Sequence, residues 1–270
     1  MSFISRLELR RASVELVRQM SIKPLLNQHA FITGGSKGIG SAIAAKLSSL
    51  GCRVTILARN QDLLKAQTDQ LNHKYPLPNG EKHSYVKFDL LRPSELEKFI
   101  SEGKCFHRTN ILVNCAGMTQ KTLLMTTSPQ EIADIINVNL TSPIILSKLF
   151  VKSTSRVKDP GYNASIVNIS SVVSVPGNNL TGASVYTATK AALTRFTQAL
   201  AAEQPAIHDR RPLSPLVRVN VLLPRHIADT DIGKSVKTPS VGTSTAEDVA
   251  QAVADLVTDD HNVGGAATVV

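Results

Sequence analysis

A glycine-rich turn near the start of the chain constrains its fold more than any other feature. The apolar run 30–32 is followed by Thr33-Gly34-Gly35-Ser36-Lys37-Gly38-Ile39-Gly40 and then by a helical pattern over 42–47. Glycines at 34, 38 and 40 allow a tight turn, a close approach of the backbone to a pyrophosphate, and close packing of helix against strand. The helix N-terminus would present free N–H groups to the anion. A plain glycine-rich connection is the alternative, but the strand before the turn and the helix after it favour a dinucleotide site. Its expected members are Gly34, Ser36, Lys37, Gly38, Ile39 and Gly40.

Strand patterns alternate with helix patterns through the rest of the chain. The strand patterns cover 52–57, 85–88, 111–114, 164–169 and 217–223, and the helix patterns cover 61–72, 129–154, 183–203 and 245–257. This order predicts an α/β protein with one Rossmann-type, doubly wound parallel sheet and helices on both faces. A chain of 270 residues that is 42% hydrophobic can fill one such unit, so we assign 26–270 to a single dinucleotide-binding catalytic domain.

Two side chains in the predicted helix 183–203 suggest acid–base chemistry. Tyr186 and Lys190 are four residues apart, which places them on one helix face. A phenol has an ordinary pKa of about 10, and a neighbouring ammonium lowers it by stabilising the phenolate. Such pairs also occur by chance on amphipathic helices, so the pair needs further motifs to support it.

Further motifs appear in a fixed order along the chain. They are Asp89 after a strand, Asn114-Cys115-Ala116-Gly117 after the next, Asn139 in a long helix, and Ser171 at a strand end. Together with the glycine turn and Tyr186-x-x-x-Lys190, they make the chain, from about residue 28 to the C-terminus, resemble the short-chain dehydrogenase/reductase family of nicotinamide-dependent oxidoreductases.

The resemblance implies a role for each matched residue. Asp89 would contact the adenine, and Asn114, Ala116 and Gly117 would line the cofactor cleft. Asn139, Ser171, Tyr186 and Lys190 would form the catalytic tetrad. Tyr186 would protonate the developing alkoxide, while Ser171, with Ser170 as its adjacent competitor, would hold the carbonyl oxygen. Lys190 would lower the pKa of Tyr186 and bind the nicotinamide ribose, so Tyr186 and Lys190 also belong to the cofactor site, and Asn139 would hold a water of the proton relay.

The chain departs from the family pattern after the predicted strand 217–223. Pro224 is followed by Arg225, where the family usually has glycine. If Thr230 matches the family threonine that meets the nicotinamide carboxamide, the loop carries one extra residue. Ile227 and Thr230 are assigned to the cofactor site on that basis. The segment 225–244, which forms the substrate lid in the family, is short and predicts an open site.

Charge at the tip of the predicted strand 52–57 indicates the cofactor. An acidic residue there would favour NAD through the ribose 2′-hydroxyl, whereas a 2′-phosphate needs cations. The strand ends in Ala58-Arg59-Asn60 with no acid, and Lys37 in the glycine turn adds a second cation. Solvated surface cations are the alternative, but two basic residues at the two deciding family positions predict NADPH and the reductive direction.

The net charge of +9 bears on partners. It fits an acidic partner such as an acyl carrier protein, with Lys152, Arg156, Lys158 and Arg195 as a dock, or a basic protein with solvated lysines. The basic residues show no aromatic interleaving, which argues against nucleic acid as a partner.

No apolar run approaches the roughly 20 residues that cross a bilayer, so we expect no membrane partner. The three cysteines are odd in number and form no metal-like cluster, which indicates a reducing compartment and no metal site.

The first 25 residues are arginine-rich, contain serine and carry two glutamates. They are a mitochondrial presequence or a plain N-terminal extension, because such presequences usually avoid acidic residues. We therefore expect a mitochondrial matrix protein, or otherwise a cytoplasmic one.

The runs 112–120, 137–139 and 184–193 resemble fungal 3-oxoacyl-[acyl-carrier-protein] reductases of the mitochondrial fatty-acid synthesis type. The first hypothesis is therefore NADPH-dependent reduction of a carrier-bound 3-oxoacyl thioester to the 3-hydroxyacyl thioester. The second is a carbonyl reductase or alcohol dehydrogenase acting on free ketones or secondary alcohols. The third is a non-catalytic dinucleotide-binding protein. The family forms dimers and tetramers through the two long helices, so we also expect a homo-oligomer.

Overall fold

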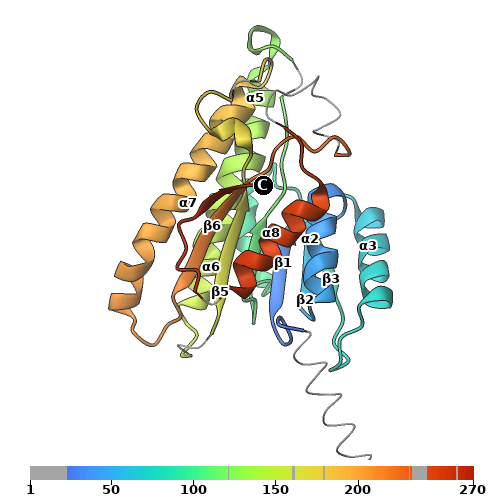
Figure 1. Ribbon diagram of the computed structural model, residues 1–270, viewed down its shortest axis with the longest axis vertical. Coiled ribbons are helices and arrows are strands. Elements are labelled where there is room, and N and C mark those ends of the chain that lie inside the picture. Colours follow the sequence, from blue (N-terminus) through green and yellow to red (C-terminus); the bar gives the residue numbers. More distant parts are fainter. Residues whose placement is uncertain are drawn as a thin grey trace, which may run out of the picture.

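Seven parallel strands form a single sheet in the order β3-β2-β1-β4-β5-β6-β7 (Figure 1). The computed structural model describes residues 23–120, 122–159, 162–178, 180–230, 232, 242–259 and 261–270, so all but the last three residues of the predicted N-terminal extension 1–25 lie outside it. The strands are β1 (His29–Thr33), β2 (Arg53–Ala58), β3 (Ser84–Lys87), β4 (Ile111–Asn114), β5 (Ala164–Ile169), β6 (Val217–Leu223) and β7 (Ala267–Val269). The predicted α/β fold with one doubly wound parallel sheet is confirmed.

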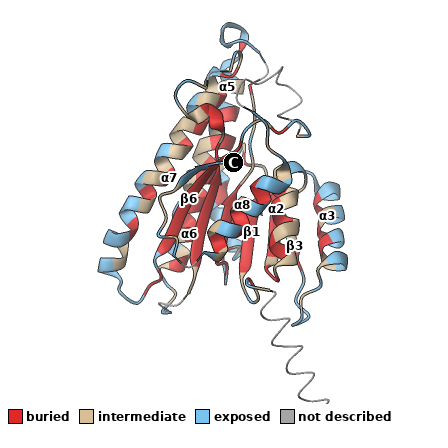
Figure 2. Ribbon diagram, viewed as in Figure 1, coloured by how far each residue is buried: buried red, intermediate tan, exposed pale blue. Residues whose placement is uncertain are grey.

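Helices cover both faces of this sheet. One face carries α2 (Gly38–Ser49), α3 (Gln61–Lys74) and α8 (Ala246–Thr258), and the other carries α4 (Pro93–Glu102), α6 (Ser142–Thr154) and α7 (Ser184–Arg210). A short helix, α5 (Pro129–Ile136), precedes α6. Each face has its own hydrophobic core, and the five inner strands between them are buried along most of their length, whereas the edge strands β3 and β7 are not (Figure 2).

The strand sequences explain the two cores. Successive side chains of a strand point to opposite faces. In β1, Ala30 and Ile32 pack on the side of α2 and α8, whereas Phe31 packs on the side of α4 and α6. A strand that is apolar on both faces has a continuous run of hydrophobic residues in its sequence. Such a run is typical of parallel strands that lie between two layers of helices.

Two helices differ from their predicted extent. The helix predicted at 183–203 continues to Arg210 and contains Pro205, which lacks a backbone N–H. The side chain of Gln204 donates to the carbonyl of Leu200 at 3.1 Å in this region. The helix therefore accommodates the proline and continues past it to Arg210.

The helix predicted at 129–154 is one continuous helical stretch with a π-helical turn inside it. The turn η2 (Asn137–Thr141) separates α5 from α6. By length and hydropathy alone this stretch could cross a membrane, yet half of its most apolar window is buried in the protein. Its α6 part packs against α4 and the sheet, so it is a core helix of this fold.

The order of the strands fixes where a site can form. From the adjacent strands β1 and β4, the chain proceeds outward in opposite directions. In such sheets the loops at the carboxyl ends of the two central strands separate and leave a crevice. The glycine turn follows β1, and the Asn114–Gly117 motif follows β4, so both motifs lie at this crevice.

Candidate active site

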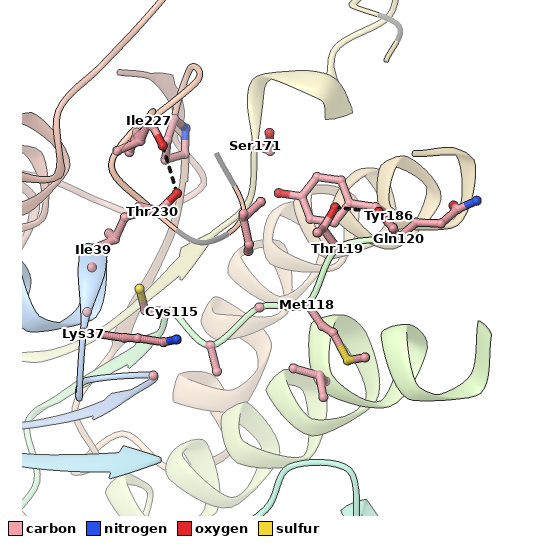
Figure 3. A pocket seen from close by; sticks show the side chains of 18 of the residues that line it. Lys37, Ile39, Cys115, Met118, Thr119, Gln120, Ser171, Tyr186, Ile227 and Thr230 are labelled. Atoms are coloured by element: carbon pink, nitrogen blue, oxygen red, sulfur yellow. Dashed lines mark hydrogen bonds between the residues drawn. The ribbon is translucent and has the colours of Figure 1, made fainter. Parts of the chain in front are cut away.

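A cleft of about 1360 Å³ runs along the carboxyl edge of the sheet (Figure 3). Fourteen of the residues predicted for the site line it: Gly34, Ser36, Lys37, Gly38, Ile39, Gly40, Arg59, Asp89, Ala116, Gly117, Ser171, Tyr186, Ile227 and Thr230. The other three, Asn114, Asn139 and Lys190, are buried behind the cleft wall. The structure therefore brings together residues that are up to 196 positions apart in the sequence.

The glycine turn fits closely against its neighbours. Gly34 has φ +70°, and a Cβ placed on it would lie 2.9 Å from Cα of Ala116. A Cβ on Gly40 would lie 2.3 Å from the carbonyl oxygen of Gly34. A side chain at either position would therefore push apart the turn, the start of α2 and the loop after β4.

One end of the cleft is suited to a phosphate group. Helix α2 begins with no side-chain cap and no acidic residue in its first turn, so its first N–H groups can receive an anion. Lys37 extends into the cleft near Cys115 (Figure 3), and Arg59 is exposed on the wall beside it. Asp89 is half-buried on the same wall and accepts a hydrogen bond from the amide of Leu91 at 3.1 Å.

Asn114 supports the cleft from behind and does not line it, which corrects its predicted role. Its Nδ2 donates to Oδ1 of Asn168 at 2.8 Å and to Oγ of Ser147 at 3.3 Å, which ties β4 to β5 and α6. The loop after β4 is instead held by Thr33, whose Oγ1 accepts from the amides of Cys115 at 3.0 Å and Ala116 at 3.1 Å. Sequence reasoning missed Thr33, although it stands directly before the first glycine.

Ser171 and Tyr186 meet at the other end of the cleft. Figure 3 shows both side chains at the same end of the cleft, Ser171 just after the end of β5 and Tyr186 in the first turn of α7. Burial raises the pKa of Tyr186, and a hydrogen bond with Ser171 lowers it in part. Ser170 is turned away, because its Oγ donates to the carbonyl oxygen of Lys190 at 2.8 Å. The choice of Ser171 over Ser170 agrees with this geometry.

Lys190 lies beneath Tyr186, with its Nζ 5.8 Å from the ring centroid. The ammonium donates to the carbonyl oxygen of Ile169 at 2.8 Å, and burial lowers the pKa of this lysine to about 8. The predicted effect of Lys190 on the pKa of Tyr186 stays a prediction, and so does its contact with a ribose.

Asn139 is fully buried in the π-helical turn. Its Oδ1 accepts from the amide of Met118, and its Nδ2 donates to the carbonyl of Met118, both at 2.8 Å. A further bond from Nδ2 reaches Oγ1 of Thr189 on α7 at 3.1 Å. The side chain thus fixes the loop after β4 against the helix that carries Tyr186. Its role in a water relay stays a prediction.

The loop after β6 closes the remaining side of the cleft. Ile227 is buried, and Oγ1 of Thr230 donates to its carbonyl oxygen at 2.9 Å. Both residues line the cleft, as predicted. Arg225 is exposed at the cleft, with its backbone amide held by the carbonyl of Val270 at 2.9 Å. Residues 231 and 233–241 of the predicted lid lie outside the described part of the chain.

These features define a class of protein. An uncapped helix N-terminus after a glycine turn, with cations beside it, fits the phosphates of a dinucleotide. A buried tyrosine, serine and lysine at the opposite end of the same cleft fit acid–base chemistry on a carbonyl or alcohol. The arrangement is that of a dinucleotide-dependent oxidoreductase.

The comparisons with known proteins agree. The sequence model described as short chain dehydrogenase matches residues 28–240, and the chain belongs to this family. A human 3-oxoacyl-[acyl-carrier-protein] reductase is 32% identical over 207 residues, covering 76% of this chain and 78% of the relative. Carbonyl reductase family member 4 of Danio rerio is 30% identical over 200 residues, covering 74% and 75%. A metagenomic short-chain oxidoreductase solved in complex with NADP superposes with a TM-score of 0.71 at 28% identity, covering 92% of this chain and 98% of its own. The prediction of an oxidoreductase of this family is confirmed.

Proposed function

We propose that the protein reduces a 3-oxoacyl thioester, bound to an acyl carrier protein, to the 3-hydroxyacyl thioester with NADPH. The observation that carries the proposal is the protonated, buried Tyr186 beside Ser171 in a cleft whose other end carries Lys37 and Arg59. The name of the human relative supports the proposed substrate, and the name of the NADP-bound structure supports the proposed cofactor.

The cofactor would lie along the cleft with its pyrophosphate at the N-terminus of α2 and its 2′-phosphate between Lys37 and Arg59. The cleft lining is open at Gly117, where an added Cβ would meet no atom closer than 3.7 Å. When bound, NADPH supplies the hydride for the carbonyl carbon.

The chain's own residues supply the proton and hold the substrate. Ser171 donates a hydrogen bond to the carbonyl oxygen and polarises it. As the carbonyl carbon gains the hydride, the oxygen takes the proton from the Tyr186 hydroxyl, and the tyrosinate regains a proton from solvent by way of Lys190. Burial raises the pKa of Tyr186, so the hydroxyl carries its proton at neutral pH, as the reductive direction requires.

Three of the four basic residues predicted for the carrier dock, all except Arg195, lie away from the catalytic end of the cleft. Lys152 lies in the last turn of α6, and Arg156 and Lys158 follow it on the way into β5. These residues lie where β5 begins, whereas Ser171 lies where β5 ends. A carrier bound there would sit at the opposite edge of the sheet from Tyr186, so we no longer assign these residues to the dock.

A carbonyl reductase that acts on free ketones or secondary alcohols is the second candidate. The name of the Danio rerio relative favours it, and so does the exposure of the segment beside the catalytic end. There the side chains of Leu123 and Leu124 are about half exposed (55% and 54%), so a free apolar ketone could reach Tyr186 without a carrier.

The deciding experiment follows the loss of NADPH absorbance with one short 3-oxoacyl group in three forms: on an acyl carrier protein, on a bare thioester, and as a simple ketone. We expect kcat/KM to be highest with the carrier and far lower when NADH replaces NADPH. Equal values on bare ketones would favour the second candidate. No turnover in any arm, with NADPH still binding, would favour a non-catalytic dinucleotide-binding protein.

We propose further that the protein is a homo-oligomer in the mitochondrial matrix and belongs with the fungal mitochondrial-type reductases. The arginine-rich segment that precedes the described residues supports the location. Light scattering measures the mass of the oligomer. A fluorescent fusion, made with and without residues 1–22, tests the location of the protein in the cell. A monomer, or an unchanged location after truncation, would contradict the respective part.

A further inference from the structure

A buried glutamine outside the predicted tetrad connects the two walls of the catalytic end of the cleft. Gln120 lines the cleft but is only 5% exposed. It follows the β4 loop on one wall, while Tyr186 begins α7 on the other. Figure 3 shows its side chain running beside Tyr186 and away from the open space.

The first contact of Gln120 is with the start of α7. This helix has Ala183 as its N-cap residue, which offers no side-chain acceptor to the first N–H groups. Oε1 of Gln120 accepts from the amide of Val185 at 2.9 Å, although the two residues are 65 positions apart. The glutamine therefore caps the N-terminus of α7, as the side chain of a Ser, Thr or Asp at the N-cap position does in other helices.

The second contact is with the segment 122–127. Both hydrogens of Nε2 are used, one on the carbonyl of Thr122 at 2.8 Å and one on Oγ1 of Thr127 at 3.1 Å. Because the amide of Val185 can only donate, the orientation of the Gln120 amide is determined. This segment carries Leu123, whose Cδ2 lies 3.9 Å from a Cβ placed on Gly182 across the cleft.

We propose that Gln120 is a positioning residue for Tyr186. It fixes the first turn of α7 to the segment 122–127, so the Tyr186 hydroxyl, one residue after Val185, is held at a set distance from the wall that faces the substrate. The kinetic part of this inference rests on the proposed reduction, whereas the structural part does not. A misplacement of about 1 Å in such a site can reduce turnover roughly a hundredfold.

The test compares Gln120→Met, which keeps the length but loses every hydrogen bond, with Gln120→Glu, which keeps the acceptor for Val185 and loses the donors to Thr122. Gln130→Met is the matched control, because Gln130 is exposed on α5 and bonds only Asp134 among the contacts resolved for its side chain. Amide hydrogen exchange by mass spectrometry over 184–187 is read first, since it needs no activity.

For Gln120→Met we expect faster exchange over 184–187, a kcat at least about tenfold lower and an unchanged KM for NADPH. For Gln120→Glu we expect slow exchange to persist over 184–187 and part of kcat to return, while exchange over 122–127 increases. The control should match the wild type in every measurement. If Gln120→Met does not fold, the Gln120→Glu result alone decides. Only a cap at Val185 predicts that exchange stays slow over 184–187 while it becomes faster over 122–127.

Unchanged exchange over 184–187 in Gln120→Met would overturn the inference, as would faster exchange with unchanged kcat. If the wild type reduces no 3-oxoacyl thioester, the proposed function fails. The exchange data would still decide whether Gln120 fixes the start of the helix.

Discussion

Tyr186 is the residue on which the proposed chemistry depends. Its ring is 8% exposed, so Tyr186→Phe keeps the packing and removes only the hydroxyl. We expect kcat to fall by roughly 10²–10⁴, the usual contribution of a general acid, with little change in NADPH affinity. Steady-state kinetics measure kcat, and cofactor fluorescence measures the affinity for NADPH. The control is Tyr162→Phe, which removes a hydroxyl bonded to the carbonyl of Thr109 at 2.9 Å, remote from the cleft, and should leave kcat unchanged.

We expect Lys190 to set the alkaline limit of activity. Burial lowers its pKa to about 8, so its ammonium loses a proton as the pH rises through this value. The tyrosinate is then no longer reprotonated through Lys190. We expect kcat for reduction to be constant below about pH 7 and to fall above pH 8. A pH profile that is flat to pH 10 would contradict this role.

We expect Arg59 and Lys37 to determine the preference for NADPH over NADH. Arg59→Ala would remove the proposed charged contact to the 2′-phosphate, so the KM for NADPH should rise about tenfold, equivalent to about 1.4 kcal/mol. The KM for NADH should hardly change, because NADH lacks that phosphate. Lys65→Ala on the exposed side of α3 is the control. Equal changes for the two cofactors would show that Arg59 acts on something other than the 2′-phosphate.

At this scale the sequence predicted residues with a motif and missed those that support them. The glycine turn, Ser171, Tyr186 and Lys190 follow from spacing and order. Thr33 and Gln120 act through contacts with residues 82 and 65 positions away, which no local pattern encodes. The hydrogen bonds of Asn139 to Met118 were missed for the same reason.

Among the elements, α8 depends on one buried cation at its C-terminus. Arg218 on β6 is 8% exposed and donates to the carbonyls of Leu256, Val257 and Asp259. Carbonyls at a helix end need donors and favour positive charge. Arg218→Met removes these bonds and should lower the free energy of unfolding by about 2–4 kcal/mol. Urea unfolding measures the loss, and Arg195→Met, on the exposed side of α7, should change it by no more than about 0.5 kcal/mol.

The limits of helices were less predictable than their existence. The regular pattern of hydrophobic residues correctly predicted the bounds of β4, β5 and β6. It did not show that α7 passes through Pro205, because tertiary packing overrides the local preference of one residue. The π-helical turn at Asn137–Thr141 left no signal either, since its extra residue is stabilised by contacts of Asn139 with the neighbouring loop.

At the scale of the whole molecule, two buried histidines make stability depend on pH. His29 begins β1 and His83 directly precedes β3, and burial lowers the pKa of both, that of His29 to about 3. Nδ1 of His83 accepts from the amide of Val54 at 3.1 Å, and its Nε2 is 2.9 Å from the carbonyl of Tyr75, so the neutral ring is required.

Because the folded pKa values lie below the unfolded value of 6.5, this stability is fully present above pH 6.5 and is lost as the pH falls toward 3. Each histidine costs up to about 1.4 kcal/mol per pH unit between its unfolded and its folded pKa. We expect the urea midpoint to drop between pH 7 and pH 5. His83→Gln keeps a donor and an acceptor but does not titrate, and should reduce the drop. An equal drop in this variant would contradict the role of His83.

The apolar helical stretch Pro129–Thr154 also determines when the chain can fold during synthesis. Its α6 part is covered by side chains of β5, α7 and β6, which follow later in the sequence, up to Val219. A nascent chain that has just exposed Thr154 to the cytosol therefore carries an uncovered hydrophobic helix. Ribosome-bound chains that end before Val219 should bind chaperones, so this helix is fully covered only after β6 has been synthesised.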